Sequence, residues 1–245
     1  MNLYMSKNLA LTKIDSRILL NEIHLDNVTL NAFGRDAILQ SVDLALPMDQ
    51  TVIVESSNPQ NSVYFLQLIA GRMNCNSGQL LWNGENIFAA ENEINTNQII
   101  ASYFENHFFD RKQTVESLLK ESVMGCEFDF DQYDIFEQFE IEKYRKTQIK
   151  NLSYEFSKLV FLIKVVLASS QAIVLEDPAV GLSECNWLQL LDLIHYQQRR
   201  GHLRHIYMTN HHPTALQHLA FNKVFIEDGL LYFDEAAGYK KASHF

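Results

Sequence analysis

Alternating apolar and polar positions dominate the first part of the chain. Residues 23–30 (IHLDNVTL) and 38–46 (ILQSVDLAL) alternate with a period of two, which predicts two half-buried strands in an antiparallel arrangement. Residues 50–54 (QTVIV) form a short β-branched run, a polar loop follows over 55–61, and 62–70 carry apolar side chains on one helical face. This pattern predicts strand, loop and helix in that order.

The later pattern alternates helices with strands. The apolar run QLLW, at residues 79–82, lies between two turn signals and predicts a strand. Residues 114–157 are polar and aromatic, which predicts an inserted helical subdomain. The pattern then predicts helix, strand, helix, strand and a closing strand pair at 158–168, 172–175, 187–200, 206–208 and 224–233. Strands that alternate with helices predict an α/β fold with a mostly parallel sheet.

Composition narrows the class of protein. The chain has 245 residues, of which 47% are hydrophobic, so it can bury the core of one domain, with or without a smaller inserted one. A formal net charge of −10 gives no general electrostatic footprint for nucleic acid, and we expect no nucleic-acid partner.

Cysteine usage and hydropathy indicate a cytoplasmic protein without its own membrane span. The 3 cysteines are widely spaced and form no CxxC motif, which favours free thiols. The N-terminus lacks the continuous apolar stretch of a secretory signal. Residues 159–175, the most apolar segment, contain polar breaks and fall short of the roughly 20 residues that cross a bilayer. Any contact with a membrane is therefore expected to be indirect, through a partner.

Short motifs then occur in a fixed order along the chain. Ala70-Gly71, Ser77-Gly78 and Asn83-Gly84 follow the first helix, and LSYEFSKLVFLIKVVLASSQAIVLEDPAVGLSE begins at Leu152. The segment MTNHHP begins at Met208. In this order and spacing, the motifs resemble those of the ATP-binding cassette (ABC) ATPase family.

The resemblance covers about residues 22–234 and implies the organisation of the whole chain. It implies an ABC-ATPase-like core with an N-terminal antiparallel β-subdomain and an inserted helical subdomain at about 106–160. We therefore expect an N-terminal extension at 1–20, the cassette at 21–235 and a C-terminal tail at 236–245.

The family's phosphate loop, GxxGxGK[ST], corresponds here to ESSNPQNS. Glycines let backbone N–H groups converge on phosphate oxygens at a helix N-terminus, and the lysine adds a fixed positive charge. In this chain Glu55, Asn58 and Gln60 replace the glycines, and Asn61 stands at the lysine. Only Ser62 matches, at the position that binds magnesium in the family, although a helix-capping hydroxyl explains it equally well. We therefore expect no tight binding of ATP in the family's usual mode.

Other positions implied by the resemblance are altered or open to a second interpretation. Phe33 stands where the family stacks an aromatic ring on adenine, but ordinary packing also explains it. Glu105 replaces the usual Q-loop glutamine, and Ser183 replaces the D-loop aspartate. His211 occupies the switch-histidine position, although a histidine at a strand end is often only structural.

The signature motif, LSGGQ in the family, faces the γ-phosphate held by the opposite subunit. Here it reads LSYEF, so Ser153 is kept while Tyr154 and Glu155 bring bulk and negative charge. Because each site in a cassette pair combines one subunit's phosphate loop with the other's signature, this chain is expected to impair both sites.

The carboxylate pair that ends the strand at 172–175 is inverted in kind. Glu176 stands where the family has the aspartate that supports magnesium, and Asp177 stands where it has the glutamate that positions water. One methylene moves a carboxylate by about 1.5 Å, and misplacement of about 1 Å can cost about 100-fold in rate. The pair is interpreted as a remnant, with a working pair and a charge arrangement at a helix N-terminus as the alternatives.

Two aromatic segments are candidate contacts with other proteins. Phe108 and Phe109 follow the Q-loop position, where the resemblance implies that a permease docks. The run FDFDQYDIFEQF at 128–139 fits either a docking surface or a helix packed on the core.

These features together predict a degenerate ABC cassette that has a structural or regulatory role in a membrane transport or export complex. It is expected to lie peripherally on the cytoplasmic face, bound to a permease subunit, another cassette or both, and to hydrolyse little or no ATP. No cofactor is expected unless the nucleotide site works, in which case it takes ATP and Mg²⁺. The alternative is a weak ATPase that uses Ser62, Glu176, Asp177 and His211, and a third hypothesis is a regulator unconnected to transport.

Overall fold

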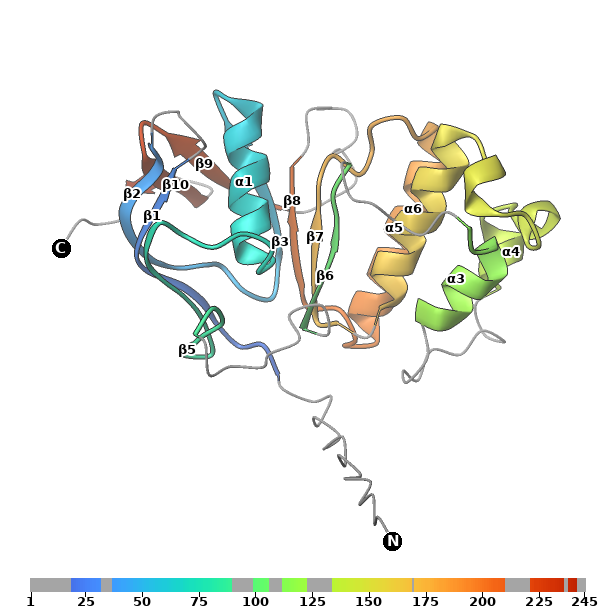
Figure 1. The fold of residues 1–245 in the computed structure, drawn as a ribbon, viewed down its shortest axis with the longest axis horizontal. Coiled ribbons are helices and arrows are strands. Elements are labelled where there is room, and N and C mark those ends of the chain that lie inside the picture. Colours follow the sequence, from blue (N-terminus) through green and yellow to red (C-terminus); the bar gives the residue numbers. More distant parts are fainter. Residues whose placement is uncertain are drawn as a thin grey trace, which may run out of the picture.

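Two β-sheets form the framework of the protein (Figure 1). The computed structural model describes residues 19–31, 37–89, 99–105, 112–122, 134–168, 170–209, 221–235 and 238–241. The smaller sheet has the strand order β2-β1-β4-β5 and is antiparallel, as the alternation at its start predicts. Its strands are β1 (Ile23–Asn31), β2 (Ala37–Ala45), β4 (Ser77–Trp82) and β5 (Glu85–Asn86).

A close approach of backbones fixes Gly78 in this sheet. Gly78 has a φ of +81°, in the left-handed region, and a Cβ built on it would lie 2.2 Å from the carbonyl oxygen of Asn27. Only glycine fits both conditions without strain. The Ser77-Gly78 turn signal therefore marks a packing requirement of the fold.

The larger sheet has seven strands in the order β11-β10-β9-β3-β8-β7-β6. Pairing is parallel from β9 through β3, β8 and β7 to β6, and antiparallel for β9-β10 and β10-β11. The predicted mostly parallel α/β sheet is confirmed. β11 lies within the stretch that the sequence assigned to a tail. The strands are β3 (Thr51–Ser56), β6 (Ile100–Tyr103), β7 (Ala172–Leu175), β8 (His205–Met208), β9 (Asn222–Glu227), β10 (Leu230–Glu235) and β11 (Gly238–Lys241).

Helices cover both faces of this sheet. Successive strand residues point to opposite faces, so Val52 and Val54 join the core under α1 and the smaller sheet, while Ile53 joins the core under α5 and α6. Figure 1 shows α1 on one side and α5 and α6 on the other, with α3 and α4 beyond α5. The helices are α1 (Pro59–Ile69), α3 (Val115–Ser122), α4 (Ile135–Gln138), η1 (Glu142–Tyr144), η2 (Ile149–Asn151), α5 (Tyr154–Leu167) and α6 (Glu184–Arg199).

As in α6, which begins at Glu184 and not at Trp187, the starts of α1 and α5 come earlier than the periodicity predicts. α1 begins at Pro59, three residues before the predicted start, because proline suits the first helical position and Asn58 caps the helix. α5 begins at Tyr154, not at Lys158, because the Ser153 side chain accepts a hydrogen bond from the N–H of Phe156. Both corrections extend a helix into a loop that the motifs mark as functional.

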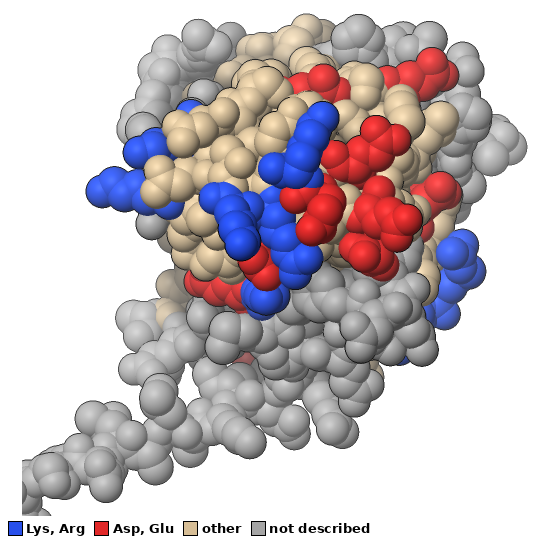
Figure 2. Space-filling model, turned by 90° about the vertical axis from the view of Figure 1, so that its right-hand side faces the viewer, with Lys and Arg blue, Asp and Glu red and all other residues tan. Residues whose placement is uncertain are grey.

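The helical end of the molecule carries charges of both signs. Ile135 and Phe136, in α4, and Phe139, directly after it, are buried, so this part of the run 128–139 packs on the core. Residues 128–133 of the run lie outside the described chain. Figure 2 shows Lys and Arg side chains gathered beside an area of Asp and Glu. Within the part of the chain that the structure describes, no helix is both long and apolar enough to cross a membrane.

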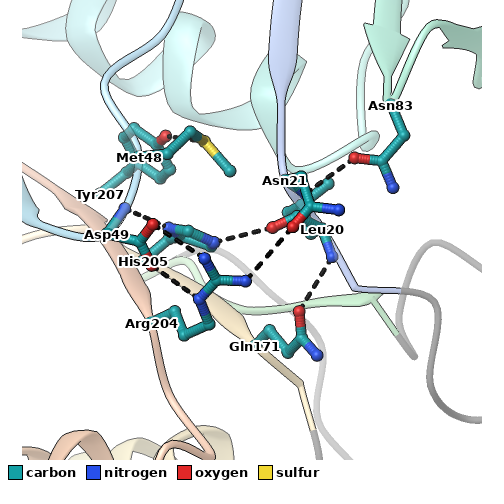
Figure 3. A network of polar contacts seen from close by, with 9 residues as sticks. All are labelled: Leu20, Asn21, Met48, Asp49, Asn83, Gln171, Arg204, His205 and Tyr207. Carbon is teal, nitrogen blue, oxygen red and sulfur yellow. Dashed lines mark hydrogen bonds and ion pairs between the residues drawn. The ribbon is translucent and has the colours of Figure 1, made fainter.

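A polar network at the start of the described chain joins it to the larger sheet (Figure 3). His205, in β8, is fully buried, and its Nδ1 accepts a hydrogen bond of 2.6 Å from the N–H of Asp49. The proton of the neutral ring must then be on Nε2, which donates to the carbonyl of Leu20 at 2.9 Å. Arg204 makes a two-pronged ion pair with Asp49, at 2.6 and 2.8 Å. The Leu20 N–H donates to the Gln171 side chain at 2.9 Å.

Candidate functional site

The candidate site lies at the carboxyl edge of the parallel strands. Because β3, β8, β7 and β6 run parallel, the residues that follow them meet at one edge of the sheet, where α/β folds bind ligands. The predicted phosphate-loop, Q-loop and carboxylate positions all follow these strands. Phe33, His211, Phe108 and Phe109 lie outside the described residues.

The loop between β3 and α1 uses its own backbone N–H groups. The N–H of Asn58 donates to Ser56 Oγ at 3.3 Å, and Pro59 has no N–H. The N–H of Gln60 donates to Asn58 Oδ1 at 3.2 Å, and that of Asn61 donates to the Asn58 carbonyl at 2.9 Å. Asn58 itself is extended, with φ −106°. Four consecutive positions therefore present no uncommitted N–H to a phosphate.

The charge at the start of this loop is also paired. Glu55 Oε1 accepts an ion-pair contact of 2.9 Å from the Nζ of Lys223, in β9. The Lys223 ammonium lies over two aromatic rings, 5.9 Å from the centroid of Phe221 and 5.7 Å from that of Phe225. The negative charge that Glu55 brings to this loop is thus offset by Lys223, a residue that the motifs did not indicate.

Ser62 differs from the rest of the loop. It lies in the first turns of α1 with 1% of its surface exposed, and its Oγ has no hydrogen-bond partner. A buried hydroxyl without a partner is uncommon. Its position therefore keeps one feature that a magnesium site requires.

The carboxylate pair after β7 is engaged with its own chain. Glu176 Oε2 accepts the N–H of Glu105 at 2.9 Å. Burial raises the pKa of Glu176, and the negative charges of Asp177 and Glu105 raise it further. The backbone N–H of Asp177 donates to Thr209 Oγ1 at 3.0 Å, and its φ is +41°. A left-handed backbone at a non-glycine residue is uncommon and fits a constrained turn.

The Q-loop position is occupied by two groups from α5. Glu105 accepts a hydrogen bond of 2.8 Å from the hydroxyl of Tyr154 and an ion-pair contact from the ammonium of Lys158. Burial and Glu105 together raise the pKa of Tyr154 to about 12, so the hydroxyl stays a donor at neutral pH. The Tyr154 ring packs on Gly181, where an added Cβ would lie 2.6 Å from it. The signature tyrosine therefore contacts the chain's own Q-loop and D-loop.

Glu155 is likewise directed to the start of α6. Its Oε1 accepts the N–H of Ser183 at 2.7 Å and the side-chain amide of Asn186 at 2.6 Å. The bond from Ser183 is the main reason that the pKa of Glu155 lies below its usual value. The negative charge predicted to oppose a partner's nucleotide is therefore held by the helix N-terminus of the same chain.

Four participants were missed by motif reasoning: Lys158, Lys223, Thr209 and Asn186. Lys158 is the one whose signal was present, because a lysine at the start of a strongly apolar helical run predicts a buried or functionally paired charge. Thr209 and Asn186 carry no such signal, because a threonine after a strand and an asparagine in a first helical turn are common.

The site residues do not fit Mg²⁺·ATP. Ser62 keeps its hydroxyl, but the loop lacks the lysine, its N–H groups are committed, and the Q-loop carboxylate is bound to an ammonium. Among the described residues, no group of three or more His, Cys, Asp or Glu side chains is placed to share a metal ion. Contacts within the chain instead hold the loops at the carboxyl edge of the parallel strands.

Comparisons with known proteins agree with the fold and the order of motifs. The family model described as "ABC transporter" matches residues 39–180. A curated protein of Vibrio parahaemolyticus, "Putative ABC transporter ATP-binding protein VPA1482", is 19% identical over 177 residues, which are 70% of this chain and 31% of that protein. This chain therefore spans about a third of the length of that relative.

Solved structures resemble the chain over most of its length. An ATP-binding subunit of an ABC transporter superposes with a TM-score of 0.69 and 16% identity, over 85% of this chain and 87% of that one. A nucleotide-free ATP-binding cassette from an ABC transporter gives a TM-score of 0.65 and 14% identity, over 91% and 92% of the two chains. At such low identity the likeness shows the fold, and the predicted fold class is confirmed.

Proposed function

The chain belongs to the ABC transporter family, and from that membership we propose that it is a degenerate nucleotide-binding-domain subunit that hydrolyses little or no ATP. Its role is structural or regulatory, within a membrane transport or export complex. The observation that carries the proposal is the state of the loop between β3 and α1, where Asn58 takes two of the N–H groups that a phosphate would need.

The missing lysine acts in the same direction. Phosphate binding at a helix N-terminus combines converging N–H groups with positive charge. Asn61 supplies no charge, and the Lys223 ammonium is bound to Glu55. Each lost charge-assisted hydrogen bond is worth about 1.5 to 3 kcal/mol. Losing two or more therefore weakens ATP binding by at least about two orders of magnitude.

The signature also favours a non-catalytic subunit. Tyr154 and Glu155 bond within the chain, to Glu105 and to Ser183, and the exposed Tyr154 ring places bulk where the family has a small glycine. A homodimer of this chain would have two such sites. A partner cassette would keep its own phosphate loop but meet this altered signature, so catalysis in the complex falls to other subunits.

The proposed location follows from the family. Cassettes of ABC transporters work beside a permease, and no helix in the part of this chain that the structure describes can cross a membrane. We place the subunit at the cytoplasmic face, bound to a permease, to another cassette or to both. Co-purification from native membranes tests this part, and recovery with neither kind of partner contradicts it.

One observation keeps a weak ATPase as a second candidate. The Ser62 hydroxyl is buried without a partner, as a residue that waits for a magnesium ion would be. In that case Glu176 and Asp177 still organise metal and water. The two candidates differ in one measurable property, which is the affinity for ATP in the presence of Mg²⁺.

The test is ATP binding and hydrolysis on the purified chain. We expect no heat of binding in calorimetry at millimolar ATP with Mg²⁺, and a phosphate release that is equal in wild type and Asp177→Asn. Equal rates identify residual release as a contaminant, because Asp177 stands at the water-positioning position. Micromolar binding, with turnover lost in Asp177→Asn, refutes the proposal and establishes the second candidate.

A further inference from the structure

A buried lysine lies at the centre of the candidate site. The side chain of Lys158, in the first turns of α5, is 1% exposed. Its Nζ contacts Glu105 Oε1 and donates to the Asp177 carbonyl at 2.8 Å, and it lies 5.5 Å from the centroid of the Tyr103 ring. An ammonium is removed from water at a cost of several kcal/mol unless it is paired and hydrogen-bonded. Lys158 satisfies this condition through groups far from it in sequence.

These groups belong to separate loops. Glu105 follows β6, and Asp177 follows β7, while Lys158 belongs to the helix that begins with the signature. The N–H of Glu105 also donates to Glu176 Oε2, which joins the two loops directly. Tyr154, four residues before Lys158, donates to the second oxygen of the Glu105 carboxylate. Glu105 and Lys158 together thus connect three segments of the chain.

Negatively charged groups surround Lys158. The carboxylates of Glu105, Glu176 and Asp177 lie at one edge of the sheet, and the negative charges of Asp177 and Glu105 each disfavour ionisation of Glu176. The Lys158 ammonium opposes that effect. Lys164 lies six residues later in the same helix and is only partly buried. The buried position of Lys158 is therefore tied to the carboxylates and not to the helix as such.

We propose that Lys158 is an internal counter-ion that holds the Q-loop, the end of β7 and the signature helix in one arrangement without a bound nucleotide or metal. Tyr154 is a positioning residue that orients Glu105 for this contact. Glu155 extends the arrangement to α6, through Ser183. The inference rests on the proposed function in one respect, because it takes these loops to work without ATP.

Amide hydrogen exchange on the nucleotide-free chain tests the proposal. Two peptides report on it: one covers 99–105, with the Glu105 N–H, and one covers 172–183, with the Asp177 N–H. We expect Lys158→Met to accelerate exchange in both peptides by about tenfold or more, since local opening follows loss of local contacts. The matched control is Lys164→Met, which makes the same change in the same helix and is expected to leave both peptides unchanged.

A second variant removes the dependence on how well Lys158→Met folds. Lys158→Met/Glu105→Gln replaces the buried ion pair by two neutral groups, and we expect it to restore much of the protection that Lys158→Met loses. Tyr154→Phe, which removes one hydroxyl, is expected to accelerate exchange at Glu105 alone. Equal exchange in wild type and Lys158→Met overturns the proposal, and so does a double variant that exchanges as fast as Lys158→Met.

The outcome is separate from that of the ATP experiment. Calorimetry with ATP decides whether the chain binds nucleotide, and the exchange experiment contains none. Tight ATP binding together with fast exchange in Lys158→Met would refute the proposed function and keep the internal counter-ion. Absence of ATP binding together with unchanged exchange in Lys158→Met would support the proposed function and refute the internal counter-ion.

Discussion

The buried histidine at the base of the sheet gives the sharpest stability prediction. His205→Leu removes the acceptor of the Asp49 N–H and the donor to the Leu20 carbonyl (Figure 3). Each buried polar group left without a partner costs about 1 to 3 kcal/mol, so the loss of both partners is expected to lower the free energy of unfolding by roughly 2 to 6 kcal/mol at pH 8. This is a large part of the stability of a typical domain.

The same residue predicts how the loss depends on pH. Burial is the main cause that lowers the pKa of His205 below its usual value of 6.5, outweighing the bond to Leu20 and the charge of Asp49, which raise it. A protonated ring would also direct an Nδ1–H at the Asp49 N–H, so two donors would face each other. The unfolded chain therefore binds the proton more readily, and the contribution of His205 is complete above pH 6.5 and decreases as the pH falls below it.

Urea unfolding followed by circular dichroism, at pH 8 and pH 5.5, measures both effects. The gap in unfolding free energy between wild type and His205→Leu is expected to narrow at pH 5.5, because only the wild type loses this contribution. Each pKa unit of difference between folded and unfolded states corresponds to about 1.4 kcal/mol. Arg204 and Asp49 remain charged at both pH values, so their ion pair does not change the comparison.

The control is His202→Leu, at a partly buried histidine three residues earlier in the chain. It is expected to change stability by less than about 1 kcal/mol. A gap for His205→Leu that stays constant between the two pH values would refute the conclusion that burial lowers the pKa of His205. A loss below about 1 kcal/mol would refute the claim that both bonded groups are left unsatisfied.

Two further changes test local requirements of the fold. Gly78→Ala is expected to lower stability by roughly 2 kcal/mol or more in thermal unfolding, because its Cβ would overlap the Asn27 carbonyl at φ +81°. The control Gly84→Ala, at φ +80° with open space around it, should lose only about 1 kcal/mol. Equal losses in the two variants would contradict the overlap. Glu155→Gln is expected to lower stability by about 0.5 to 1 kcal/mol at pH 7 in urea unfolding. The difference in unfolding free energy from wild type should shrink as the pH falls below 4.5, because the Ser183 N–H stabilises the ionised form of Glu155. A difference that grows in acid would contradict the contact.

The sequence predicted the fold through features that are local in the chain. The period-two alternation of β1 and β2 and the Ser77-Gly78 turn each depend on neighbours a few residues away. The family resemblance supplied the order of the loops and thereby the positions of Glu105, Glu176 and Asp177. Helix starts were less certain, since capping by Asn58 and Ser153 competes with apolar periodicity as a boundary signal.

The contacts of the site could not be predicted in the same way. Lys158 and Glu105 are 53 residues apart, and their contact depends on how α5 packs beside β6. Glu155 was expected to face another subunit, because the family uses that surface, but its hydrogen bonds run to α6. A motif indicates where a residue lies on the backbone, whereas the rotamer and the partners of its side chain depend on tertiary packing.

The acidic residues at the altered positions indicate that specific contacts within the chain hold these loops. Three acidic residues stand where the family has a glycine or a glutamine: Glu55, Glu105 and Glu155. In a loop that had only lost the family's function, each of them would carry a charge without a partner. Instead the first has Lys223, the second has Lys158, and the third has the N–H of Ser183 together with Asn186. A half-buried carboxylate without a partner raises its own pKa and weakens the fold, so three such replacements are tolerated only when partners are present. The pairing of all three means that the loops are stabilised as they stand, which the proposed non-catalytic role requires.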